Sequence, residues 1–136
     1  WRPPDVATAL PRTAVHSDRA PAAIGPYSQA TRAGNLVLFS GQIPLDPATG
    51  DLVAGDIAAQ ARRAFDNLKA VCDAAGGTMH DIVRVGLYLT DLAEFAAVNA
   101  VMGEYFAQPY PARSTIEVSA LPKGARFEVD AVMALA

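Results

Sequence analysis

The chain has 136 residues, of which 51% are apolar and 18% are charged, and its formal net charge at pH 7 is −3. A chain of this length and composition favours one domain with a sizeable core. The eleven Lys and Arg residues are scattered, so the sequence offers no basic patch for a nucleic-acid partner. No apolar run approaches the ~20 residues of a membrane-spanning helix, so we expect no membrane partner.

Two further counts limit the chemistry. The single cysteine, Cys72, cannot form a disulfide within the chain, which fits a reducing compartment, and we expect a cytoplasmic protein. The two histidines, His16 and His80, stand far apart without metal-ligand spacing. We therefore expect no bound metal ion.

Residues 1–15 carry three prolines and no sustained periodicity, which predicts a loosely ordered extension. We expect a single domain over residues 16–136. An approach strand is expected over residues 22–33, before a turn signal. The next strand is expected over residues 36–39, where the continuous apolar run LVLF predicts burial on both faces.

The first helix is expected over residues 56–75, because apolar side chains recur there at helical spacing and Gly76-Gly77 follows. An apolar strand is expected over residues 81–90. A second helix should follow Asp91, because Glu94 stands three residues later in a capping-box pattern.

The last two strands are expected over residues 114–119 and 126–134. Helices long enough to cross over, set between strands, predict an α+β sandwich with both helices on one face of the sheet. The apolar strand residues exceed what two helices can cover, and an exposed apolar sheet face usually marks an interface. The residues that cannot all face two helices are Val37, Phe39, Val83, Val85 and Leu87. We therefore expect a homo-oligomer whose open faces pack together.

Charged side chains gather on the last two strands. Strand alternation places Arg126 and Glu128 on one face of the last strand, and Arg113 and Glu117 on one face of the strand before it. If the two strands form a hairpin, Glu117 lies across from Glu128, and one of the arginines would offset their repulsion. The same pattern also fits solvated carboxylates and a surface salt bridge for Arg113, so the pattern alone leaves both interpretations open.

The sequence lacks the usual signatures of several other chemistries. No serine or cysteine stands in a nucleophile motif, and the glycines form neither a GxGxxG nor a phosphate-binding loop pattern. Covalent and dinucleotide chemistry are therefore poorly supported.

Six stretches combine into a more specific pattern. They are APAAIGPYSQ (20–29), FSGQIP (39–44), AQAR (59–62), DNLK (66–69), DLAEFAAVN (91–99), and PARS (111–114) with EV (117–118) and LPK (121–123). In this order they closely resemble the reactive intermediate deaminase family, also called the RidA, YjgF or L-PSP family. The resemblance runs from about His16 to Leu135.

The resemblance implies a fold, an assembly and an activity. The family fold is similar to that of the bacillary chorismate mutase: a mixed six-stranded sheet with two helices on one face, assembled as a trimer with a central sheet barrel. The family's best-known activity is hydrolysis of 2-imino acids and their enamine tautomers to 2-keto acids and ammonia. It needs no cofactor, and its sites lie in clefts between subunits.

Carried over by position, the family's two key residues fall on Arg113, which would bind the substrate carboxylate, and Glu128, which would activate the attacking water. The remaining site residues that the resemblance implies are Tyr27, Ser40, Gly41 and Thr115. Thr115 departs from the family member that carries a cysteine at this position.

Two other functions stay open at the level of sequence. One is a regulatory module that binds a small carboxylate in the same cleft without turnover, because a fold does not fix a function. The other is a translation-inhibiting endoribonuclease, a label attached to this family. The net charge of −3 and the absence of a basic or aromatic stripe weigh against RNA.

Overall fold

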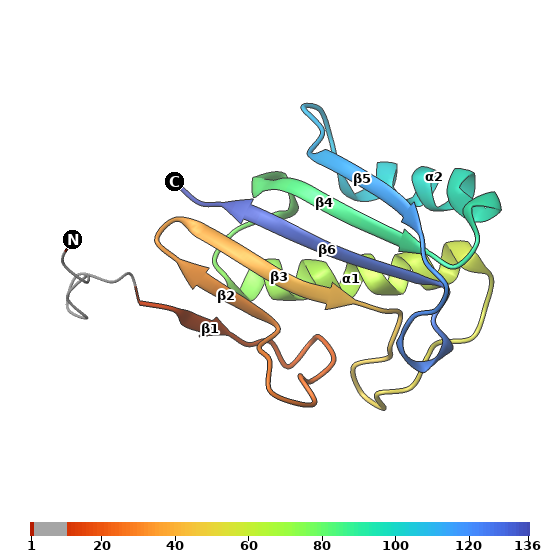
Figure 1. Ribbon diagram of the computed structural model, residues 1–136, viewed down its shortest axis with the longest axis horizontal. Coiled ribbons are helices and arrows are strands. Elements are labelled where there is room, and N and C mark those ends of the chain that lie inside the picture. The colour runs from red at the N-terminus through yellow and green to blue at the C-terminus, as the bar shows by residue number, and fades with distance from the viewer. Residues whose placement is uncertain (2–10) are drawn as a thin grey trace.

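The computed structural model describes residues 1 and 11–136. Six strands form one mixed sheet in the order β1-β2-β3-β6-β4-β5, and both α-helices lie on the same face of it (Figure 1). This arrangement confirms the predicted α+β class, with a six-stranded mixed sheet and two helices on one face. The strands are β1 Thr13–Val15, β2 Ala30–Ala33, β3 Leu36–Gln42, β4 Ile82–Leu89, β5 Ala112–Glu117 and β6 Phe127–Ala134.

The two α-helices are α1, Ile57–Ala74, and α2, Phe95–Tyr105. The Asp56 side chain caps α1 by accepting a hydrogen bond from the Ala59 amide at 2.9 Å, and Gly76 follows the helix with a φ of +86°. The predicted helix is therefore confirmed to within one residue at each end. Three single-turn 3-10 helices complete the fold: η2 Met79–Asp81, η3 Leu92–Glu94 and η4 Pro122–Gly124.

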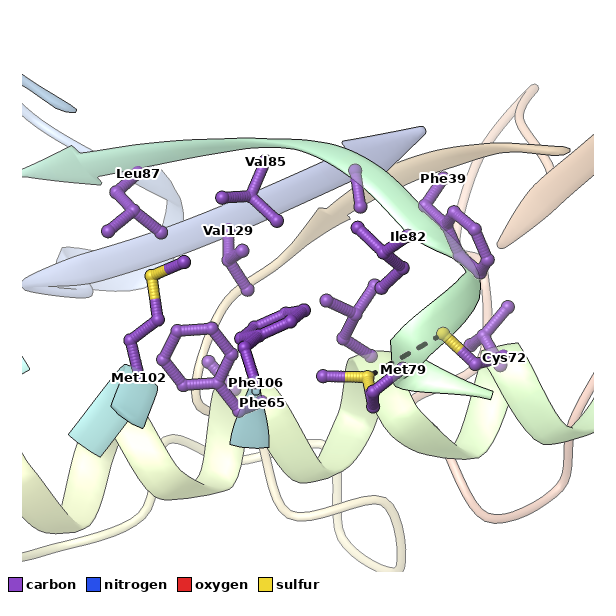
Figure 2. Packing of buried hydrophobic residues seen from close by; sticks show 14 of the residues in the cluster. Phe39, Phe65, Cys72, Met79, Ile82, Val85, Leu87, Met102, Phe106 and Val129 are labelled. Atoms are coloured by element: carbon purple, nitrogen blue, oxygen red, sulfur yellow. Dashed lines mark hydrogen bonds between the residues drawn. The ribbon is translucent and has the colours of Figure 1, made fainter. Parts of the chain in front are cut away.

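The hydrophobic core fills the space between the sheet and the helices (Figure 2). Phe65 of α1 lies at its centre, with ring centroids 5.2 Å from Tyr105, 6.0 Å from Phe106 and 5.5 Å from Phe127. Cys72 is fully buried, and burial raises the pKa of its thiol to about 12. This side chain belongs to the core rather than to a reactive site.

Three predictions for the first part of the chain differ from the structure. The strand expected over residues 22–33 is confined to β2, because Gly25, with a φ of +123°, and Pro26 interrupt residues 22–29. Residues 36–39 are not buried on both faces but alternate. The stretch 1–15 contains β1, which pairs with β2 at the sheet edge; residues 2–10 of this expected extension lie outside the described residues.

The capping box predicted for the second helix is wrong. Asp91 caps η3 by accepting from the Ala93 amide, and α2 begins only at Phe95 without a side-chain cap. The Glu94 carboxylate instead pairs with the Arg126 guanidinium at 2.8 Å. A tertiary ion pair has therefore replaced the local contact that the spacing indicated.

The predicted hairpin of the last two strands is also wrong. β5 runs parallel to β4 at the sheet edge, and β6 lies between β3 and β4. Glu117 is therefore paired with Leu89, and its carboxylate accepts from the Leu92 amide at 3.0 Å. Glu128 lies opposite Tyr88, so the two glutamates do not face each other.

No helix of the described chain covers the other face of the sheet, but the apolar residues exposed on it differ from those predicted. Four of the five named residues are buried beneath the helices, and only Val83 is exposed. The apolar residues of the open face come from the opposite parity of the strands. Together with Val83 they are Leu36, Leu38 and Ile116, each 43–49% exposed.

Candidate functional site

One cavity of about 590 Å³ opens beside Glu128, and we call it the Glu128 pocket. Three chain segments and the β6 carboxylate form its wall. The segments are the loop before β2, the end of β3 with the loop after it, and η4. The lining residues are Pro21, Ala22, Ile24, Tyr27, Gln29, Ser40, Gly41, Gln42, Ile43, Leu45, Pro122, Lys123 and Glu128.

Strand alternation sets the direction of Glu128. Its neighbours Phe127 and Val129 are fully buried on the helix side, so Glu128 lies on the open face of the sheet. Burial, and to a lesser degree the nearby Asp130 carboxylate, raise the pKa of Glu128. A carboxyl group whose ionised form is disfavoured holds a proton more readily, which suits it to proton transfer.

Gly41 makes room for this carboxylate. A Cβ atom added at Gly41 would lie only 2.7 Å from the carboxyl carbon and from one oxygen of Glu128. Any side chain at position 41 would therefore displace Glu128. The glycine is required here by close approach and not by backbone conformation.

Hydrogen bonds to the backbone hold the first wall of the pocket. Gln29, only 3% exposed, accepts from the Ser17 amide at 2.7 Å and donates to the carbonyls of Ser17 and Pro21 at 3.1 and 2.8 Å. The Ser40 hydroxyl donates to the Ser28 carbonyl at 2.6 Å. The loop that carries Tyr27 is thus tied to the sheet at both of its ends.

The other walls are fixed in a similar way. Asn67 of α1 is fully buried and donates to the carbonyls of Ile43 and Leu45 at 3.3 and 2.9 Å. On η4, Lys123 has a φ of 59° and its ammonium group donates to the Gly50 carbonyl at 3.0 Å. Polar side chains therefore determine where the pocket loops lie.

A second cavity of about 490 Å³ lies beside Arg113 on the helix side of the sheet, and we call it the Arg113 pocket. The Arg113 guanidinium lies over the Phe95 ring at 5.2 Å, and its Nη1 donates to Asn99 Oδ1 at 2.6 Å. Its lining residues are Asn99, Met102, Gly103, Tyr110, Pro111 and Arg113.

Within one chain the structure groups only some of the predicted site residues. Tyr27, Ser40, Gly41 and Glu128 line one pocket, whereas Arg113 lines the other. Arg113 contacts α2 on the helix side, and Glu128 lies on the open face, so the two side chains are on opposite faces of the sheet. A small substrate cannot meet both side chains of the same chain.

Thr115 lies on the same face of β5 as Arg113, two residues along the strand. Its hydroxyl oxygen is buried and has no hydrogen-bond partner within the described part of the chain. Thr115 lines neither of the two pockets in the single chain.

Sequence reasoning assigned no role to several residues that the structure brings into the pockets. Asn99 is one of them, although a weak helix former within the alanine-rich run AAVNAVM was a usable signal. Ile24 is another: an apolar residue in a Gly/Pro loop, it is 78% exposed at the rim of the Glu128 pocket. Tyr110 and Lys123 are not unusual residue types for their local sequence, so composition did not single them out.

Two other features are absent among residues 1 and 11–136. No three His, Cys, Asp or Glu side chains there are grouped so that they could hold a metal ion. No helix among these residues has the length and apolar character needed to cross a membrane.

The fold and pockets define a small α+β domain that presents a desolvated carboxylate and an arginine in separate cavities. The sequence model of the family described as "Endoribonuclease L-PSP" matches residues 17–135. Protein DfrA of Myxococcus xanthus is 54% identical over 125 residues, covering 90% of this chain and 95% of that protein. A 2-iminobutanoate/2-iminopropanoate deaminase of Escherichia coli strain K12 is 46% identical over 121 residues, covering 87% and 94%.

The chain is also similar to solved structures. RidA from an Antarctic Psychrobacter species superposes with a TM-score of 0.87 at 45% identity, covering 90% of this chain and 99% of that one. Escherichia coli TdcF with bound serine superposes with a TM-score of 0.85 at 40% identity, covering 91% and 99%. The chain therefore belongs to the reactive intermediate deaminase (RidA/YjgF/L-PSP) family.

Proposed function

We propose that this protein hydrolyses reactive 2-imino acids and their enamine tautomers to 2-keto acids and ammonia. The substrates would be 2-aminoacrylate with its tautomer 2-iminopropanoate, and 2-iminobutanoate. The observation that carries the proposal is Glu128, a partly desolvated carboxyl group with a raised pKa that faces a cavity. Relatives 43–46% identical to this chain are named for this reaction, which supports the choice of substrate.

In the proposed complex Arg113 binds the substrate carboxylate. A guanidinium can donate two parallel hydrogen bonds to a carboxylate, which fixes the orientation of the substrate as well as its charge. The protonated imine carbon is already electrophilic, so no covalent nucleophile and no cofactor are required. Holding the substrate and one water molecule in place supplies much of the acceleration.

Glu128 would act first as a base and then as an acid. Its carboxylate takes a proton from water while the water oxygen bonds to the imine carbon, which gives a neutral carbinolamine. Glu128 then returns that proton to the amine nitrogen. The carbon–nitrogen bond breaks, the hydroxyl group loses its proton to the departing ammonia, and a 2-keto acid and ammonium remain.

The other predicted site residues would shape the cleft. Tyr27, Ser40 and Gly41 line the Glu128 pocket and would surround the reacting end of the substrate. Thr115, which shares a face of β5 with Arg113, would lie next to the carboxylate end.

The proposed site is completed between subunits. Because Arg113 and Glu128 lie on opposite faces of one sheet, the Arg113 pocket of one chain must meet the Glu128 pocket of another. We propose a homotrimer with its open sheet faces packed around a central barrel. This assembly would cover Leu36, Leu38 and Ile116.

A coupled assay tests the proposed reaction. In the assay a threonine dehydratase generates the imine, and semicarbazide traps whatever imine remains. We expect the reaction to take place in the cytoplasm in vivo. The wild-type protein should suppress trapping, whereas Arg113→Ala and Glu128→Ala proteins should not. Unchanged trapping with wild-type protein would favour the carboxylate-binding module instead.

A further inference from the structure

Three side chains of α2 contact the Arg113 guanidinium. Asn99 Oδ1 accepts from Arg113 Nη1 at 2.6 Å, Met102 Sδ lies 3.6 Å from the same nitrogen, and the Phe95 ring lies under the guanidinium carbon at 5.2 Å. Phe95, Asn99 and Met102 are spaced four and three residues apart, so they share one face of the helix. We call this group the α2 cradle.

The α2 cradle makes its polar contacts with Nη1 and leaves the other two guanidinium nitrogens available. In the described part of the chain Nη1 makes all the hydrogen bonds of the Arg113 guanidinium, and Nε and Nη2 donate to no partner. These two nitrogens form the edge that grips a carboxylate with two parallel bonds. The contact with Nη1 therefore sets which edge is left for a ligand.

Asn99 makes the most directional contact of the three. A guanidinium only donates, so the Asn99 atom that it meets must be the amide oxygen, and this fixes the orientation of the amide. The side chain is exposed and packs into no core, so packing does not explain the presence of asparagine in an alanine-rich helix. Alanine there would favour the helix more.

We propose that Asn99 is a positioning residue that presents the free edge of Arg113 to the substrate carboxylate, with Phe95 and Met102 supporting the plane of the guanidinium. This inference rests on the proposed role of Arg113 in binding the substrate. Asn99 acts through Arg113 and takes no part in proton transfer. Its loss should weaken the binding of any small 2-keto or 2-imino acid.

The test combines four variants with two measurements. The variants are Asn99→Ala, Arg113→Ala, the double variant, and the control Ala100→Asn, which keeps Asn99 and adds a second asparagine at the adjacent exposed position of α2. Calorimetry measures the affinity for 2-oxobutanoate, a stable product of the proposed reaction. The coupled assay gives kcat and KM for 2-iminobutanoate.

We expect Asn99→Ala to lower the 2-oxobutanoate affinity and to raise KM, each about tenfold, because the guanidinium is less often in place to bind the anion. We expect kcat to be nearly unchanged, because a bound substrate still makes both hydrogen bonds to Arg113 and meets an intact Glu128. In the Arg113→Ala background, Asn99→Ala should have no further effect on affinity. Ala100→Asn should behave as wild type, and all four variants should keep the wild-type helical signal in circular dichroism.

Each alternative outcome has a distinct meaning. Unchanged affinity and KM in Asn99→Ala, or the same tenfold loss in the Arg113→Ala background, would overturn the positioning role. If the wild type binds 2-oxobutanoate but hydrolyses no imine, a loss of affinity in Asn99→Ala still supports the positioning role while the proposed function fails. A wild type that binds no 2-oxobutanoate would overturn the inference.

Discussion

Glu128 shows at the scale of one residue how a proposed function costs stability. Burial disfavours its ionised form, and the neighbouring Asp130 adds repulsion, so its pKa in the folded chain lies above the ordinary value. The folded state then binds the Glu128 proton more tightly than the unfolded state. The contribution of Glu128 to the free energy of unfolding is therefore fully present below the ordinary pKa. It is lost as the pH rises from there through the raised pKa.

Glu128→Gln should consequently abolish imine hydrolysis and yet raise the Tm at pH 7, because an uncharged amide escapes the burial cost of the carboxylate. At about pH 3.5, below the ordinary glutamate pKa of ~4.3, the two proteins should melt at nearly the same temperature. Thermal unfolding followed by circular dichroism at both pH values measures this. A variant that melts below wild type at pH 7 would contradict the account.

At the scale of elements, polar side chains in the core fix the loops of the Glu128 pocket. Asn67 is the clearest case, since it is fully buried and donates from α1 to the carbonyls of Ile43 and Leu45, while its oxygen accepts from Arg63. Leucine has a similar size but cannot donate. It would leave the two carbonyls without their partner.

We expect Asn67→Leu to lower the free energy of unfolding by about 3 kcal/mol, from ~1–3 kcal/mol for each carbonyl left unsatisfied. Urea denaturation measures the change. The control is Arg63→Ala, which leaves only the Asn67 oxygen without its partner and should cost about 1 kcal/mol, less than Asn67→Leu. Equal stability of Asn67→Leu and wild type would show that the loop does not depend on this residue.

The elements also show what the sequence could predict. The bounds of α1 followed from a helical stripe and from Gly76-Gly77 after it, both local signals. The position of β5 did not, because a parallel partner and an inserted strand are set by the whole sheet and not by the short connection between β5 and β6. For the same reason the pairing predicted between Glu117 and Glu128 failed.

The candidate site was predictable in part. Residues lining the Glu128 pocket came from the family motifs, and strand alternation correctly placed Glu128 on the polar face of β6. Asn99 and Ile24 received no role, because their positions depend on how α2 and the loop before β2 pack. The separation of Arg113 from Glu128 depends on which face of the edge strand meets α2, and no local pattern encodes this.

At the scale of the whole molecule, the proposed function depends on an assembly. A single chain holds both halves of the proposed site on opposite faces of its sheet, so an isolated chain should be inactive. The proposed oligomer would bring the Arg113 pocket of one subunit to the Glu128 pocket of the next, and a closed ring would do this at every interface.

The most direct test of this claim mixes two inactive proteins. Arg113→Ala and Glu128→Ala chains are unfolded together and refolded, native mass spectrometry confirms mixed trimers, and imine hydrolysis is measured. With sites shared between subunits, random mixing should restore roughly a quarter of the wild-type activity, because that fraction of interfaces joins an intact Arg113 to an intact Glu128. Mixed trimers without recovered activity would contradict a site built from two chains.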